Sequence, residues 1–213
     1  MKKYLLAVLA LGATMMMACE PANKGGNDDV KADYELTAEN VFQATLDYGG
    51  DWYGEGTDNG MIMLTSIDDP TMQNVTKMSA LLLDYVLPVK EVFDGCGTLK
   101  PGINALEAND QPVAPGTYVV GVYDEVEDTV YGCGYMELDY TAMAYTVMEP
   151  VVDGEFTVAL EGEAYTVKGL LTLGNGKTVK VNYKGALVSS IAPLSRVSRP
   201  KHAAAAFASF LNK

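Results

Sequence analysis

Alternation of apolar and polar residues with a period of two is the feature that most limits how this chain folds. It recurs in short segments between about residues 41 and 190, for example 42–46, 61–65, 116–123 and 156–160. Such a period places successive side chains on opposite faces of a β-strand, whereas a helix needs a period of about 3.6. Glycine, asparagine and aspartate separate the segments, as turns require. The pattern predicts about eight to ten strands and no long helix before the C-terminal tail.

The turns between these segments indicate how the strands connect. The clearest hairpin is expected where residues 165–173 and 177–183 flank Gly174, Asn175 and Gly176. Asn-Gly favours a tight hairpin because both residues tolerate a positive φ. Short strands joined in this way predict an all-β fold, either an antiparallel β-sandwich or jelly roll or, as the alternative, a calycin-like closed β-barrel.

The first nineteen residues have the pattern of an exported lipoprotein. Lys2 and Lys3 give a positive start, and residues 4–18 carry no charge. As a helix that run is too short to cross a bilayer, but it fits a signal peptide. Its end at Ala18-Cys19 resembles a lipobox, although Met16 stands where leucine is usual. We expect cleavage after residue 18 and a lipid with acyl chains such as palmitate on Cys19; an incidental cysteine after an ordinary signal is the alternative.

The rest of the chain divides into three parts. Residues 19–40 contain few large apolar side chains and predict a flexible tether. Residues 41–190 form the predicted β domain. Residues 191–213 are a basic tail in which four consecutive alanines, 203–206, favour a short helix with Phe207, Phe210 and Leu211 on one face.

Three features of the sequence together resemble those of a known group of proteins. A methionine-rich signal, Asp28-Asp29 soon after Cys19 and a β-rich body resemble the small cell-envelope lipoproteins of Bacteroidetes-type bacteria, and residues 155–187 are similar to the closing hairpin of uncharacterised domains in that group. The resemblance implies an outer-membrane lipoprotein and leaves both its periplasmic and its surface-exposed placement open. It implies no particular activity.

Charge and composition exclude several classes of function. The formal net charge of −13 opposes nucleic-acid binding, which depends on lysine and arginine neutralising phosphates. His202 is the one histidine and lies in the tail, so the β domain offers no Ser-His-Asp arrangement. The chain has three cysteines and no CxxC pair, which argues against a zinc site. It also has no glycine-rich phosphate loop, which argues against a nucleotide-binding enzyme. We therefore assign no catalytic residue, metal or cofactor.

Cys96 and Cys133 occupy similar Gly-Cys-Gly settings in a chain expected to be exported. Because an exported compartment is oxidising, the sequence favours a structural disulfide between them. Two buried thiols are the alternative, and a reactive pair is a third reading.

One segment stands out as a candidate ligand site because it combines the only tryptophan with tyrosines and carboxylates. Aromatic faces and acidic acceptors suit a sugar, although Trp52 can equally be a core anchor at a bent strand end. Binding of calcium by the acidic side chains is a further possibility, although this segment lacks the spacing of an EF-hand loop. The candidate residues are Tyr48, Asp51, Trp52, Tyr53, Glu55 and Asp58.

Three function classes follow. The first is a membrane-anchored, non-catalytic surface lipoprotein that binds a glycan, a small molecule or a protein. The second is a structural or adhesive subunit that pairs through its β edges. The third is a hydrolase that uses two carboxylates.

Overall fold

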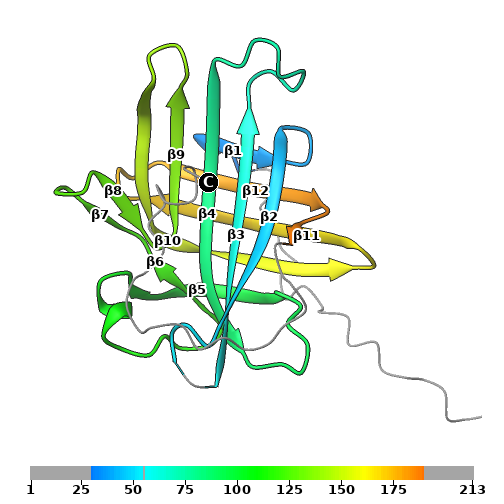
Figure 1. Ribbon diagram of the computed structural model, residues 1–213, viewed down its shortest axis with the longest axis vertical. Coiled ribbons are helices and arrows are strands. Elements are labelled where there is room, and N and C mark those ends of the chain that lie inside the picture. The colour runs from blue at the N-terminus through cyan, green and yellow to red at the C-terminus, as the bar shows by residue number, and fades with distance from the viewer. Residues whose placement is uncertain (1–29, 55, 190–213) are drawn as a thin grey trace, which may run out of the picture.

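The computed structural model describes residues 30–54 and 56–189. This part of the chain is almost entirely β, which confirms the predicted fold class (Figure 1). The expected signal peptide, Cys19, Glu55 and the C-terminal helix lie outside the described residues.

The strands are short to medium in length, with one exceptionally long strand near the C-terminal end of the fold. Their bounds are β1 (Tyr34–Thr37), β2 (Val41–Gly50), β3 (Thr57–Ile67), β4 (Lys77–Pro88), β5 (Gly97–Asn104), the 3-10 helix η1 (Glu107–Asn109), β6 (Thr117–Val120), β7 (Val122–Asp124), β8 (Thr129–Tyr131), β9 (Gly134–Asp139), β10 (Ala144–Glu161), β11 (Ala164–Leu173), β12 (Thr178–Gly185) and β13 (Val188–Ser189).

Five of these strands close into a barrel. β4 pairs with β6, β6 with β5, β5 with β10, β10 with β9, and β9 with β4 again. The sheet continues beyond the barrel through β11, β12 and β1 on one side and through β3, β2 and β13 on the other. Figure 1 shows these two extensions as crossing layers, with β11 and β12 behind β2, β3 and β4. The alternative prediction of a closed barrel therefore fits the structure.

The long strand β10 joins the two layers. Its first part, Ala144 to Pro150, pairs with β9, and its second part, from Val151 onward, pairs with β11. The register shifts between Val151 and Asp153, where the strand passes from one layer to the other. Because β10 belongs to both layers, it joins them, and its first part rises beside β9 beyond β11 and β12 in Figure 1.

The main core fills the space between the layers. On β4 the alternate residues Leu81, Leu83 and Tyr85 face this core, where Tyr85 meets the ring of Phe156 edge-on at 5.8 Å. The intervening Ala80 and Leu82 of β4 belong to a second apolar cluster on its other face. Both faces of β4 are thus buried, and each fully buried large side chain contributes about 1.5–3 kcal/mol.

The predicted hairpin around Gly174 to Gly176 is confirmed. β11 and β12 pair in antiparallel register from Tyr165↔Gly185 to Thr172↔Thr178. The amide of Leu173 donates to the carbonyl oxygen of Lys177 at 2.8 Å, and Gly176 has φ 82°. Only glycine adopts such a φ without strain, which explains why this turn could be recognised.

Two expectations need correction. The sheet is not wholly antiparallel, because β1 with β12, β13 with β2 and β5 with β6 pair in parallel. The tether, expected over residues 19–40, ends earlier, because Tyr34–Thr37 form β1. Leu36 of this strand is 1% exposed and packs in the main core, so burial of a single leucine and pairing with β12 order a segment of otherwise polar composition.

Candidate functional site

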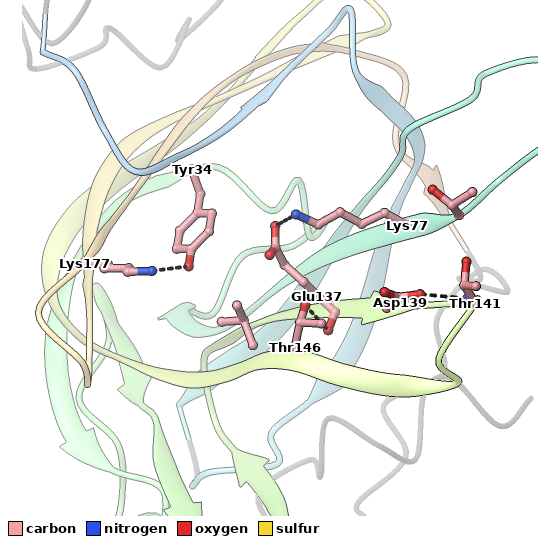
Figure 2. A pocket seen from close by; sticks show the side chains of 9 residues that line it. Tyr34, Lys77, Glu137, Asp139, Thr141, Thr146 and Lys177 are labelled. Atoms are coloured by element: carbon pink, nitrogen blue, oxygen red, sulfur yellow. Dashed lines mark hydrogen bonds and ion pairs between the residues drawn. The ribbon is translucent and has the colours of Figure 1, made fainter.

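A pocket of about 550 Å³ lies at the end of the barrel where β9 ends and β10 begins (Figure 2). We call it the mouth pocket. Eight of its nine lining side chains are polar, and four of them carry a charge at neutral pH. The lining residues are Tyr34, Thr76, Lys77, Glu137, Asp139, Thr141, Thr146, Val147 and Lys177.

The strand register explains why these side chains meet. Glu137 and Asp139 are two residues apart on β9 and share its inner face. Lys77 of β4 lies opposite Asp139 in the antiparallel ladder. β1 brings Tyr34 from the other layer, and the hairpin between β11 and β12 brings Lys177.

Glu137 is the most enclosed charged group of the pocket, with only 7% of its surface exposed. Its Oε1 forms an ion pair with the Lys77 ammonium at 2.7 Å and accepts a hydrogen bond from the Tyr135 hydroxyl at 3.0 Å. Ser79 donates a longer bond of 3.4 Å to the same oxygen. In the described part of the chain no donor reaches Oε2. The carboxylate is therefore held in place through one oxygen while the other keeps its capacity to accept hydrogen bonds.

The Lys177 ammonium lies over the ring of Tyr34, which in turn packs on Tyr135. The rings of Tyr34 and Tyr135 pack at a centroid distance of 4.5 Å, and burial raises the pKa of Tyr135 so that its hydroxyl stays a donor. The Lys177 ammonium donates to the Tyr34 hydroxyl at 3.2 Å and lies 5.4 Å from the centre of that ring. This hydrogen bond raises the pKa of Lys177, which therefore remains charged.

Asp139 has a different role at the rim. Its Oδ1 accepts the backbone N–H groups of Thr141 at 2.7 Å and Ala142 at 3.0 Å. These bonds, first that from Ala142 and then that from Thr141, lower the pKa of the carboxyl group. Asp139 thus stays ionised and fixes the turn that leads into β10.

The segment expected from the sequence to bind a ligand does not contribute to the mouth pocket. Tyr53 is buried, and its hydroxyl donates to Asp84 Oδ2 at 2.5 Å. Trp52 packs against an apolar cluster that includes Tyr53 and Val86. Asp84 is seven residues along β4 from Lys77, roughly 24 Å at about 3.4 Å per residue, so this segment lies far from the mouth pocket. Trp52 and Tyr53 thus pack against the apolar interior of the fold, and a ligand site in this segment stays a prediction.

Three further members of that expected site, Tyr48, Asp51 and Asp58, are also engaged with the protein. Tyr48 donates to Asp58 Oδ1 at 2.7 Å and packs on Phe93 at 4.6 Å. Asp51 accepts the Gly54 amide at its backbone oxygen, 3.2 Å away. Asp58, Asn59 and Gly60 have the composition of a turn, but all three lie within β3.

The disulfide expected between Cys96 and Cys133 is not formed in the described part of the chain, where both thiols are buried. The Cys133 thiol is engaged with the backbone of Asp84, whose N–H donates to the sulfur at 3.1 Å and whose carbonyl oxygen accepts from it at 3.3 Å. The Cys96 sulfur lies 3.4 Å from the backbone oxygen of Asp94, which accepts its hydrogen bond. The two Gly-Cys-Gly segments therefore lie at two separate positions of the backbone and do not mark a disulfide.

The sequence offered little signal for the mouth pocket. In β9, Tyr135, Glu137 and Asp139 alternate with Met136 and Leu138, which normally places the acidic residues outside. Here Met136 is buried on the opposite face in its own cluster, so both faces are covered. Tyr34 fell in the expected tether. The sequence therefore showed the alternation along β9 but not which of its faces lines the pocket.

No family model matches the chain, and neither curated proteins nor solved structures show significant similarity to it. The described residues include no helix that is long and apolar enough to cross a membrane.

Proposed function

We propose that this protein is a membrane-anchored, non-catalytic lipoprotein of the outer membrane that binds a glycan in the mouth pocket. The observation that carries the proposal is the set of eight polar side chains around one space of about 550 Å³. A sugar presents many hydroxyl groups, and each buried hydroxyl needs a donor or an acceptor. The pocket supplies both kinds, with Glu137 Oε2 as an acceptor held in place by its neighbours.

The carboxylates of the pocket favour binding over hydrolysis. A glycosidase needs one carboxyl group that is protonated and can act as an acid, together with one that is ionised. The pKa of Asp139 is lowered by backbone donors, and Glu137 lies 2.7 Å from the Lys77 ammonium. The backbone donors thus keep Asp139 ionised, so it cannot serve as the protonated member of such a pair. This supports a binding site rather than an acid–base pair.

Glu137→Gln is expected to weaken glycan binding by about tenfold or more, because a hydrogen bond to a charged group contributes about 1.5–3 kcal/mol. Isothermal titration of the full-length protein with sugars selected on a glycan array measures this. Glu161→Gln is the matched control, since Glu161 also forms a lysine ion pair, with Lys184 at 2.8 Å, but does not line the pocket. Equal affinities for wild type and Glu137→Gln, with thermal unfolding showing a folded variant, would contradict the proposal.

The membrane anchor is proposed from residues 1–19, where an uncharged run ends in Ala18-Cys19. Cys19→Ala is expected to move the protein from the membrane fraction to the soluble fraction and to remove the mass of the acyl chains. Intact-mass analysis and fractionation of wild type and variant measure both effects. A variant that stays with the membrane, beside a wild type without acyl mass, would show that Cys19 is not the anchor.

A further inference from the structure

We infer that the glycan of the mouth pocket is anionic and that its carboxylate or sulfate group binds at Lys177. The inference rests on the proposed glycan-binding function and names the class of sugar. It depends on how the four charges of the pocket are compensated.

Three of these charges have strong partners within the protein. Lys77 and Glu137 neutralise each other at 2.7 Å. Asp139 is compensated by two backbone N–H groups at 2.7 Å and 3.0 Å. Neither carboxylate is therefore left to attract a cationic ligand strongly.

Lys177 differs from these three groups. Its ammonium donates to the hydroxyl of Tyr34, and within residues 30–54 and 56–189 no carboxylate lies within ion-pair distance, so Asp33 and Glu137 act on Lys177 only at longer range. An ammonium has three donors, and Tyr34 uses one of them. Lys177 is thus the group of the pocket whose positive charge an anionic ligand can match.

The positions of the polar groups match one molecule that is both anionic and rich in hydroxyls. Tyr34 connects the two ends of the pocket. Its hydroxyl accepts a hydrogen bond from Lys177 (Figure 2), and its ring packs on Tyr135, which in turn donates to Glu137. Lys177 only donates, and Glu137 Oε2 only accepts. A sugar acid or a sugar sulfate brings acceptor oxygens to Lys177 and hydroxyl donors to Glu137 in the same ring.

The negative net charge of the chain makes the position of the Lys177 ammonium important for binding an anion. A formal charge of −13 repels anions at long range, so an anionic ligand needs a local positive group to bind. Screening by salt weakens both the long-range repulsion and an exposed contact with Lys177, but the contact acts within a few ångströms and is screened less. Selectivity for the anionic sugar is therefore expected to persist at moderate salt.

The test compares matched sugars by isothermal titration of the full-length protein in 150 mM salt. The pairs are galacturonate with galactose, glucuronate with glucose, and galactose 6-sulfate with galactose. We expect an anionic member to bind about tenfold or more tightly than its neutral partner. Lys177→Met is expected to remove this preference, so that the charged and the neutral member of a pair bind equally, whereas Lys177→Arg retains the preference. Lys184→Met, which changes an exposed lysine outside the pocket, is the control.

The outcomes separate this inference from the function on which it rests. Preference for the uronates alone identifies a carboxylate, and preference for the sulfate alone identifies a sulfate ester; both support the inference. Equal binding of charged and neutral sugars overturns it and leaves glycan binding intact. An anionic preference that survives Lys177→Met also overturns it. Absence of binding to every sugar overturns both proposals.

Discussion

Replacing Cys133 with alanine is expected to lower the free energy of unfolding by about 3 kcal/mol or more, because the change leaves two buried backbone groups without partners. The thiol accepts the Asp84 N–H and donates to the Asp84 carbonyl oxygen. Each buried polar group that loses its only partner costs about 1–3 kcal/mol. The small cavity left by the sulfur adds to the loss.

The topology of β4 explains why a side chain is needed at this point. β4 pairs with β9 as far as Leu82↔Gly134, and it pairs with β6 from Tyr85↔Tyr118 onward. Asp84 lies in the gap between these two stretches, where neither β9 nor β6 has a residue paired with it. Cys133, which precedes β9, is fully buried there, and its thiol takes the place of the missing ladder bonds.

Urea unfolding of wild type, Cys133→Ala, Cys133→Ser and Cys96→Ala measures the effect. Serine can form both hydrogen bonds with a shorter reach, so it is expected to retain part of the stability that alanine loses. The Cys96 thiol donates to Asp94, only two residues away, so Cys96→Ala is expected to cost less than Cys133→Ala. A loss at Cys133 no larger than that at Cys96 would contradict the bridging role of the thiol.

Cys133 also illustrates what the sequence could reveal. The alternation of apolar residues reports local backbone geometry, and it correctly indicated strands and the β11–β12 hairpin. The exchange of β9 for β6 along β4 depends on pairings between distant segments, which leave no local pattern. The glycines beside Cys96 and Cys133 therefore suggested a shared disulfide, although each cysteine serves a different backbone junction.

The candidate site depended on long-range pairing in the same way. Asp58-Asn59-Gly60 has the composition of a turn, but Asn59 is buried within β3 and donates to Asp84 Oδ1 at 2.7 Å. Tertiary hydrogen bonds outweighed the local turn preference. The mouth pocket combines side chains from β1, β4, β9, β10 and β12 or their flanking turns, and only the register of those strands brings them together.

The second prediction with a large effect concerns Asp84 and pH. We expect the free energy of unfolding to contain a contribution that falls by roughly 3 kcal/mol as the pH rises from about 4 to about 6. Burial raises the pKa of the Asp84 carboxyl group to about 6, although the hydrogen bonds from Tyr53 and Asn59 act to lower it. An aspartate in the unfolded chain has a pKa of about 3.9.

The direction of the effect follows from the protons bound in each state. Between these two pKa values the folded protein keeps the proton on Asp84 while the unfolded chain has lost it. The stabilising contribution is therefore complete below about pH 4 and is lost as the pH rises through about 6. Exposed carboxylates whose pKa is lowered in the folded state, such as Asp68 and Asp69, act in the opposite direction and mainly below about pH 4.

A comparison with Asp84→Asn isolates the contribution of Asp84, because asparagine does not titrate while the other carboxylates remain. Urea unfolding of both proteins from pH 3.5 to pH 7.5 should give curves whose difference changes by roughly 3 kcal/mol between pH 4 and pH 6. Tyr53→Phe removes a hydrogen bond of 2.5 Å that lowers the pKa of Asp84. The free energy of unfolding of this variant should therefore continue to fall at higher pH than that of wild type. Parallel curves for wild type and Asp84→Asn would show that Asp84 is ionised throughout this range and that its burial is fully compensated by Tyr53 and Asn59.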